Sequence, residues 1–177
     1  MFDIDTFLGE CGQASGETEP RRAVAELLRS TMADASDVQD ALGPAEPGIR
    51  ILHGSPELTV LNVVWAPHME LPAHDHRMWA AIGIYAGQED NTLYRRDPDD
   101  RAGLVESGGK VLREGDVLVL GDDAIHGVEN PLARFTGAIH VYGGDFVNEP
   151  RSQWGPGEKR ERPYDLDYMR SLFERSE

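Results

Sequence analysis

The chain has 177 residues, of which 40% are hydrophobic and one is a cysteine. This length and composition suit one compact domain with an apolar core, and the single cysteine excludes an intrachain disulfide. Acidic residues number 32 against 17 basic ones, and the resulting net charge of −15 disfavours binding to nucleic acid or to anionic membranes.

Three helices are predicted before residue 48. Over residues 3–11 apolar side chains recur at i, i+3, i+4 and i+7, with Asp3 as the N-cap. A second helix begins at Pro20, since proline is favoured in a first helical turn, and a third begins at a cap on Ser36 and ends at Gly43. We expect residues 1–47 to form a helical segment that packs on the structure that follows.

From residue 48 to about residue 147 the chain changes to short β-rich runs, separated by glycine, proline, asparagine and aspartate. Short strands without helical segments between them are typical of an antiparallel sandwich or barrel. The predicted fold class is therefore all-β with flanking helices. The expected strands lie within residues 48–54, 57–67, 78–87, 91–96, 103–107, 111–122, 126–131 and 134–146.

The end of the chain is predicted to be an extension of the same domain. Residues 148–163 are rich in proline and charge, which indicates an exposed connection. Asp165 then caps a short helix. Residues 148–177 are expected to form this extension, and the buried side of its helix carries Tyr168, Met169, Leu172 and Phe173.

Three of the six histidines are predicted to bind one metal ion. His74 and His76 form an HxH motif, and in a strand residues i and i+2 project from the same face. His126 follows an apolar strand and a tight acidic turn, which would bring it to a partner strand. Three imidazoles leave coordination positions open, which suits catalysis or ligand binding better than a closed structural site.

These motifs resemble those of the cupin superfamily. HxH is followed about 50 residues later by His126 and then by Asn130, while the glutamate that cupins usually carry shortly after HxH is missing. Three histidines without that glutamate resemble the thiol dioxygenases, which include cysteine dioxygenase and 3-mercaptopropionate dioxygenase. The resemblance spans residues 48–147. It implies a cupin double-stranded β-helix, or jelly-roll barrel, that binds Fe²⁺, with another divalent metal as the alternative.

A further likeness lies in the strand expected over residues 134–146. Thiol dioxygenases carry an outer Ser-x-His-x-Tyr group there, and this chain has Ala138, His140 and Tyr142. The resemblance implies that Tyr142 and His140 are catalytic, with the Tyr142 hydroxyl directed toward the metal. The alternative is a buried, hydrogen-bonded pair that only fills the barrel.

Two residues are candidates for substrate binding. The family binds the substrate carboxylate with an arginine from an early strand, and Arg50 is the nearest counterpart; a guanidinium suits a carboxylate because it donates two parallel hydrogen bonds. Trp79 is expected to line the substrate pocket. The plainer alternatives are a surface charge for Arg50 and a core aromatic for Trp79. His53 and His68 are expected to be structural or exposed.

The implied activity is that of a non-haem iron(II) thiol dioxygenase. Such an enzyme oxidises a small thiol, for example cysteine or 3-mercaptopropionate, to a sulfinic acid with O₂. Two alternatives stay open: a cupin isomerase, lyase or hydrolase that uses manganese, nickel or zinc as a Lewis acid, and a non-catalytic cupin that binds a small molecule. The sequence selects neither the thiol nor the metal.

The sequence also predicts a cytoplasmic protein with no membrane partner. Its first ten residues are acidic where a secretion signal would be basic. No apolar run approaches the roughly 20 residues that cross a bilayer, and a lone cysteine is compatible with a reducing compartment. The oligomeric state is left open.

Overall fold

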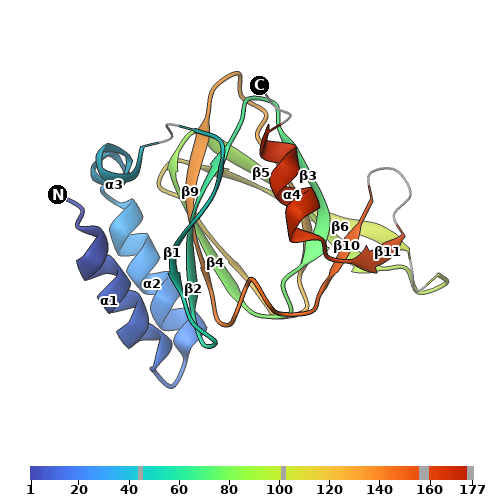
Figure 1. Cartoon of the computed structure of the whole chain (residues 1–177), viewed down its shortest axis with the longest axis horizontal. Coiled ribbons are helices and arrows are strands. Elements are labelled where there is room, and N and C mark those ends of the chain that lie inside the picture. Colours follow the sequence, from blue (N-terminus) through green and yellow to red (C-terminus); the bar gives the residue numbers. More distant parts are fainter. Residues whose placement is uncertain (44–45, 101–102, 156–159, 175–177) are drawn as a thin grey trace.

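A computed structural model of the chain describes residues 1–43, 46–100, 103–155 and 160–174. Within these residues a helical layer covers one β-sheet and a second sheet faces the first (Figure 1). The helical layer consists of α1 (Ile4–Ser15), α2 (Pro20–Met32) and α3 (Ala35–Leu42), while α4 (Leu166–Glu174) contacts β1 and β3 of the two sheets.

The sheet beneath the helices has the strand order β1-β2-β9-β4-β7. Every residue of its three central strands is buried, because helices cover one face and the second sheet covers the other. Its strands are β1 (Gly48–Gly54), β2 (Thr59–Trp65), β9 (Thr136–Tyr142), β4 (Ala80–Ala86) and β7 (Val117–Leu120).

The second sheet has the order β11-β10-β3-β8-β5-β6, and its strand pairs, like those of the first sheet, are antiparallel. The prediction of an all-β fold with flanking helices is confirmed. The strands of this sheet are β11 (Glu161–Pro163), β10 (Ser152–Trp154), β3 (Glu70–Asp75), β8 (Ile125–Glu129), β5 (Gln88–Arg96) and β6 (Leu104–Arg113).

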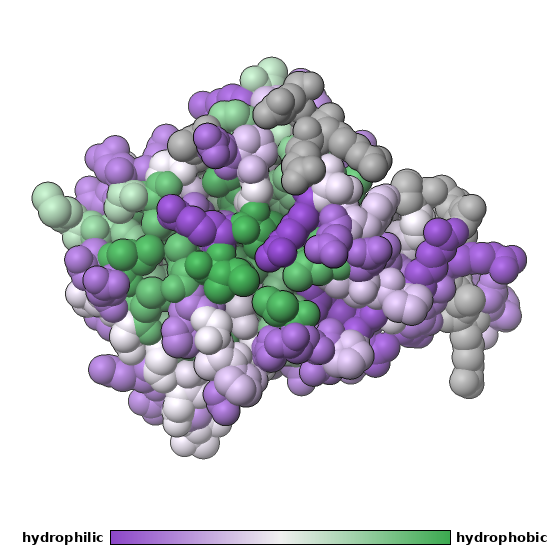
Figure 2. All heavy atoms as spheres, viewed as in Figure 1, coloured by the Kyte–Doolittle hydropathy of each residue, from purple (hydrophilic) through white to green (hydrophobic). Residues whose placement is uncertain are grey.

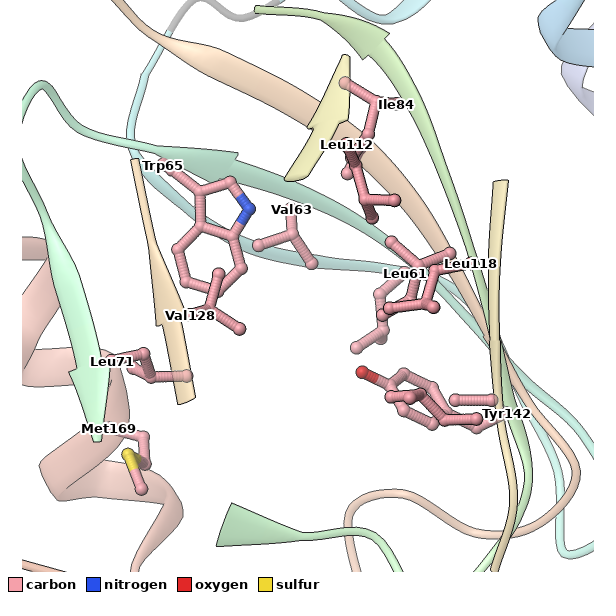
Figure 3. Close-up of a cluster of buried hydrophobic side chains, with 14 of the residues drawn as sticks. Leu61, Val63, Trp65, Leu71, Ile84, Leu112, Leu118, Val128, Tyr142 and Met169 are labelled. Carbon is pink, nitrogen blue, oxygen red and sulfur yellow. The ribbon is translucent and has the colours of Figure 1, made fainter. Parts of the chain in front are cut away.

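One hydrophobic core fills the space between the two sheets (Figure 3). Trp65 at the end of β2 stacks on Phe173 of α4, with ring centroids 5.3 Å apart, so α4 is anchored to the barrel interior. Figure 3 shows the Tyr142 hydroxyl oxygen directed into the same space. The interior of the barrel is therefore apolar, and any polar group there is removed from water.

A second core joins the helices to the outer face of the first sheet. Figure 2 shows hydrophobic residues gathered where the helical layer meets the barrel, among mostly polar surroundings. Asp3 caps α1 as predicted, since its carboxylate accepts a hydrogen bond from the Thr6 amide at 2.8 Å. The third helix begins at Ala35, so Ser36 lies inside it rather than capping it. Among the described residues, no helix is long and apolar enough to cross a membrane.

The prediction of an exposed connection over residues 148–163 is wrong for its central part. Residues 151–154 are buried, and β10 extends the second sheet by pairing Gln153 with His74 of β3. The Ser152 amide donates to the buried carboxylate of Asp75 at 2.7 Å, which fixes β10 beside the HxH motif. The composition of this segment gave a wrong prediction because its order comes from two buried groups, the carboxylate of Asp75 and the ring of Trp154. Residues 156–159 lie outside the described ranges.

We expect Gly137→Ala in β9 to lower the free energy of unfolding by about 1–3 kcal/mol, the usual range for overpacking a core. An added Cβ would lie 2.3 Å from ring atoms of Tyr85. That ring has nowhere to move, because it is fully buried and its hydroxyl donates to Asn62 at 2.8 Å. Urea denaturation measures the change.

The matched control is Gly9→Ala in α1, where no heavy atom lies within 4 Å of the added Cβ. Alanine should raise the free energy of unfolding there by about 0.5–1 kcal/mol, because glycine is a poor helix former. Wild-type stability for Gly137→Ala would contradict the close packing of β9 on Tyr85.

Candidate metal centre

The three predicted ligands lie together inside the barrel. His74 is the last but one residue of β3 and pairs with His126 of β8, and His76 comes directly after the end of β3. All three are buried, and they offer one ligand atom each within 4.8 Å of the others. The ring centroids are 4.7 Å apart for His74 and His126 and 4.9 Å apart for His76 and His126.

Burial keeps these three imidazoles neutral. It lowers the pKa of His74 to about 4 and holds the pKa values of His76 and His126 well below the usual value, with smaller contributions from neighbouring charges. A metal binds the neutral imidazole, whose lone pair is free. The site is therefore ready to bind a cation at neutral pH without first losing protons.

Two of the rings are also oriented by their other nitrogen. His74 Nδ1 lies 3.0 Å from the Pro72 carbonyl oxygen, and His126 Nδ1 lies 2.7 Å from Asn91 Oδ1. Both partners accept hydrogen bonds, so the proton sits on Nδ1 and the Nε2 lone pair is available to a metal. His126 Nε2 lies 3.3 Å from His76 Nε2. This donor set fits a divalent transition metal, because imidazole suits iron, copper, nickel and zinc.

The predicted pair His140 and Tyr142 lies beside the three histidines. His140 Nδ1 is 2.9 Å from the Tyr142 hydroxyl oxygen, and the Tyr142 ring centroid is 4.9 Å from that of His76. Burial raises the pKa of Tyr142 well above its usual value, so the phenol stays protonated. A neutral hydroxyl bonded to an imidazole thus faces the metal centre.

The structure does not bring Arg50 or Trp79 to the histidines. Ile49 faces the cavity beside them, so strand alternation turns Arg50 to the outer face, where it is exposed and close to Tyr85. Trp79 packs with the core under the helices, and its ring lies over Gly143. Both positions correct the sequence-based interpretation: Arg50 is a surface charge and Trp79 a packing residue. His53 and His68 are exposed, as expected.

An arginine that the sequence analysis missed lies at the site instead. Arg151, just before β10, is only 6% exposed, and its charge contributes to lowering the pKa values of His74 and His76. Its guanidinium carbon lies 3.7 Å from the Tyr164 ring centroid and 4.2 Å from that of Phe146. The only sequence signal for the burial of Arg151 was Trp154, an apolar residue three positions later that indicates a buried strand within a charged segment.

Two polar residues of β5 were missed as well. Glu89 and Asn91 are buried and share one face of the strand, which begins at Gln88 rather than at the predicted residue 91. Asn91 donates from Nδ2 to Glu89 Oε1 at 2.9 Å and accepts from His126. The alternation of Glu89, Asn91 and the apolar Leu93 was the available signal.

A small cavity and a surface depression lie near the centre. The cavity, of about 20 Å³, is lined by His74, His126, His140 and Tyr142 among others, and it has room for about one water molecule. The depression, of about 410 Å³, is lined by Arg77, Arg151, Arg162, Glu161 and neighbouring residues. A ligand larger than water therefore needs side chains at the cavity to move.

No protein-family model matches the chain. Among solved structures, a protein from Bacillus halodurans is 11% identical, with a TM-score of 0.51 over 72% of this chain and 85% of that chain. A double-stranded β-helix protein from Klebsiella pneumoniae is 14% identical, with a TM-score of 0.49 over 62% of this chain and 80% of that chain. The cupin domain of Schizosaccharomyces pombe Cnp3 is 11% identical, with a TM-score of 0.46 over 56% of this chain and 61% of that chain.

The Bacillus halodurans protein shares the fold of this chain, and the names of the other two similar structures describe a double-stranded β-helix and a cupin domain. Enzymes occur among the similar structures, namely an oxalate oxidase and the DMSP lyase DddQ from Ruegeria pomeroyi, with TM-scores of 0.42 and 0.45. At 18% and 17% identity they do not identify the reaction of this chain.

We expect His126→Ala to abolish retention of a divalent metal while the barrel still folds. The variant loses one of three ligands, and its small side chain leaves Asn91 without its histidine partner. Metal content after gel filtration, measured by elemental analysis, tests this, and circular dichroism monitors the fold. His53→Ala, at an exposed histidine, is the control and should keep its metal. Full metal occupancy in His126→Ala would remove this residue from the ligand set.

Proposed function

We propose that this protein is an iron(II)-dependent thiol dioxygenase that oxidises a small thiol carrying a carboxylate to its sulfinic acid. The observation that carries the proposal is Arg151, a buried cation with unused hydrogen-bond donors beside three neutral histidines and a neutral tyrosine. When bound, the metal supplies a positive centre that favours the thiolate form of the substrate and brings thiolate and dioxygen into one site.

The guanidinium of Arg151 is suited to bind an anion. It is charged at any physiological pH, and burying such a charge is costly unless it is paired. Nη1 donates to the carbonyls of Phe146 and Glu149, and the guanidinium also interacts with the Tyr164 side chain. Nε and Nη2 are buried and have no acceptor within hydrogen-bond distance among the described residues. A substrate carboxylate would accept two parallel hydrogen bonds from such a fork. Arg151 therefore replaces Arg50 as the residue proposed to bind substrate.

His140 and Tyr142 supply the remaining polar groups at the reacting end. The Tyr142 hydroxyl keeps its proton because burial opposes ionisation, and its bond to His140 Nδ1 fixes its direction. The apolar side chains of the core exclude water from the same space. These residues orient a bound thiol and hold one proton at the Tyr142 oxygen.

The reaction needs no further cofactor. Converting a thiol to a sulfinic acid places both atoms of dioxygen on sulfur, and the electrons that sulfur loses are those that dioxygen gains. No external reductant is required, which agrees with a site built only from histidine, tyrosine and arginine side chains.

The surface depression beside Arg151 offers an approach for an anionic substrate. Three arginines, Arg77, Arg151 and Arg162, line it against one acidic residue, Glu161, on a chain whose net charge is −15. Arg77 is paired with Asp75 at 2.8 Å. A local group of cations on an acidic protein attracts small anions toward that place. A thiol acid is such an anion, whereas an aminothiol without a carboxylate is not.

The first test is dioxygen uptake by protein loaded anaerobically with Fe²⁺ and offered cysteine, 3-mercaptopropionate, mercaptosuccinate and cysteamine in turn. We expect uptake with thiols that carry a carboxylate, matched one-to-one by sulfinate, and little uptake with cysteamine because Arg151 then lacks its partner. Protein that binds one iron per chain but takes up no dioxygen with any of these thiols would contradict the proposal. The next hypothesis to test would then be a cupin isomerase, lyase or hydrolase that uses its metal as a Lewis acid.

Arg151→Lys should raise the KM for the thiol acid by about tenfold to a hundredfold, because lysine keeps the charge but loses the two-pronged hydrogen bond. Arg50→Lys on the outer face is the matched comparison and should leave KM unchanged. Steady-state dioxygen uptake measures both. An increase in KM confined to Arg50→Lys would restore the sequence-based assignment.

A further inference from the structure

Glu89 is a carboxylic acid with no exposed surface, placed inside the barrel where charge is costly. Oε2 accepts a hydrogen bond from Trp65 Nε1 at 2.8 Å, and Oε1 accepts one from Asn91 Nδ2 at 2.9 Å. Oε2 also lies 3.6 Å from His140 Nε2. Glu89 thus joins the second sheet to the first, and it stands between two groups of residues at the proposed metal centre.

The first group runs through Asn91 to the metal ligand His126. Because Glu89 accepts at Oε1, Asn91 turns its amino group toward it and its carbonyl oxygen toward His126 Nδ1, 2.7 Å away. A carbonyl oxygen only accepts, so the His126 proton is on Nδ1. The lone pair is then on Nε2, the nitrogen that faces His76.

The second group consists of His140 and Tyr142. The 3.6 Å between Glu89 Oε2 and His140 Nε2 is longer than a hydrogen bond, and Nε2 has no hydrogen-bond partner among the described residues. The nearby carboxylate oxygen still favours a proton on Nε2 electrostatically, which leaves Nδ1 as an acceptor for the Tyr142 hydroxyl at 2.9 Å. The Tyr142 hydroxyl therefore donates a hydrogen bond to His140 Nδ1, and its oxygen lone pairs face the interior. The sequence-based expectation was that the Tyr142 hydroxyl is directed toward the metal, whereas here its hydrogen is directed toward His140.

We propose that Glu89 is a positioning residue that sets the proton positions on both His126 and His140, and through them the form in which His126 and Tyr142 face the metal centre. The proposal rests on the metal centre of the proposed function, not on which thiol is oxidised. Where the resembling family has a serine, this chain has Ala138, and Glu89 is the polar group that faces His140 instead.

Glu89→Gln tests the proposal with almost no change of shape. Trp65 Nε1 still needs an acceptor, so the new amide oxygen takes the place of Oε2 and the new amino group faces the amino group of Asn91. The two donors repel, and Asn91 rotates to present its amino group to His126 Nδ1. The His126 proton then moves to Nε2, and metal affinity should fall by about tenfold to a hundredfold.

The double variant Glu89→Gln/Asn91→Asp should reverse this loss. It exchanges carboxylate and amide, so the new amino group at position 89 donates to the new carboxylate at position 91, and the other oxygen of that carboxylate accepts from His126 Nδ1. Metal affinity should return to within about threefold of the wild type. Asp90→Asn, which removes a carboxylate from the opposite face of the same strand, is the control and should not change affinity.

Two measurements read the result without any thiol or dioxygen. Two-bond ¹⁵N–¹H correlations of ¹⁵N-histidine protein without metal assign the proton of each imidazole, and anaerobic titration with Co²⁺ gives the affinity. We expect His126 protonated on Nδ1 in the wild type and the double variant, and on Nε2 in Glu89→Gln. A wild-type His126 protonated on Nε2 would overturn the proposal, and this result needs no variant to fold.

The proposal would also be overturned by a folded Glu89→Gln variant with unchanged affinity, or by a folded double variant that stays as weak as the single one. The second outcome would mean that Glu89 matters only for packing. Because neither readout involves turnover, a failure to detect thiol oxidation would contradict the proposed function and leave the role of Glu89 to be decided separately.

Discussion

Removal of polar groups from water inside the barrel is the constraint on which the rest of the structure depends. Helices α1 to α3 cover the outer face of one sheet, and Phe173 of α4 stacks on Trp65 inside the barrel, so the space between the sheets is apolar. In such a space histidine stays neutral, tyrosine stays protonated and each charge needs a partner. The same burial that stabilises the fold thereby prepares three imidazoles to bind a metal.

Two buried ionisable side chains, Glu89 and Arg151, meet this constraint in different ways. Glu89 has donors at both oxygens, from Trp65 and Asn91, so its requirements are met within the protein. Arg151 has two buried nitrogens without a hydrogen-bond partner among the described residues, although its guanidinium packs against the rings of Phe146 and Tyr164. Because both oxygens of Glu89 are hydrogen-bonded, this residue can orient the side chains that it contacts. Because Arg151 has buried nitrogens without an acceptor in the described part of the chain, it can bind an anionic ligand. This difference separates the two roles proposed here.

The sequence predicted the parts that depend on local pattern. Alternation and turn residues placed most of the barrel strands, but β3 and β10 lie outside the expected strand ranges. The i, i+2 spacing of His74 and His76 predicted two imidazoles directed to one side, although His76 lies just beyond the end of β3. Asp3 was recognised as a cap because capping is decided within one helical turn. The His140 and Tyr142 pair followed the same alternation. Each of these features requires only residues that are neighbours in the chain or on one strand.

The parts that the sequence did not predict depend on strand register and on which distant segment returns to the barrel. Arg50 and Ile49 are adjacent, and only the register of β1 on β2 decides which of them faces the interior. Arg151 lies in a segment whose composition is that of a loop, and its burial follows from the bond between Ser152 and Asp75, 77 residues apart in the chain. Glu89 was missed because the start of β5 was placed too late, which hid its alternation with Asn91.

The three histidines alone do not select a reaction, since imidazole ligands accept several metals and one fold can host several chemistries. Selection has to come from the groups around them. In the proposed function Arg151 binds an anionic group beside the histidines, which disfavours neutral and cationic substrates. In the proposal made for Glu89, this residue sets, through His140, whether Tyr142 offers a proton or a lone pair to that substrate. On these two proposals the direction of the hydrogen bonds, rather than the distances among the histidines, decides which small molecule can react at the centre.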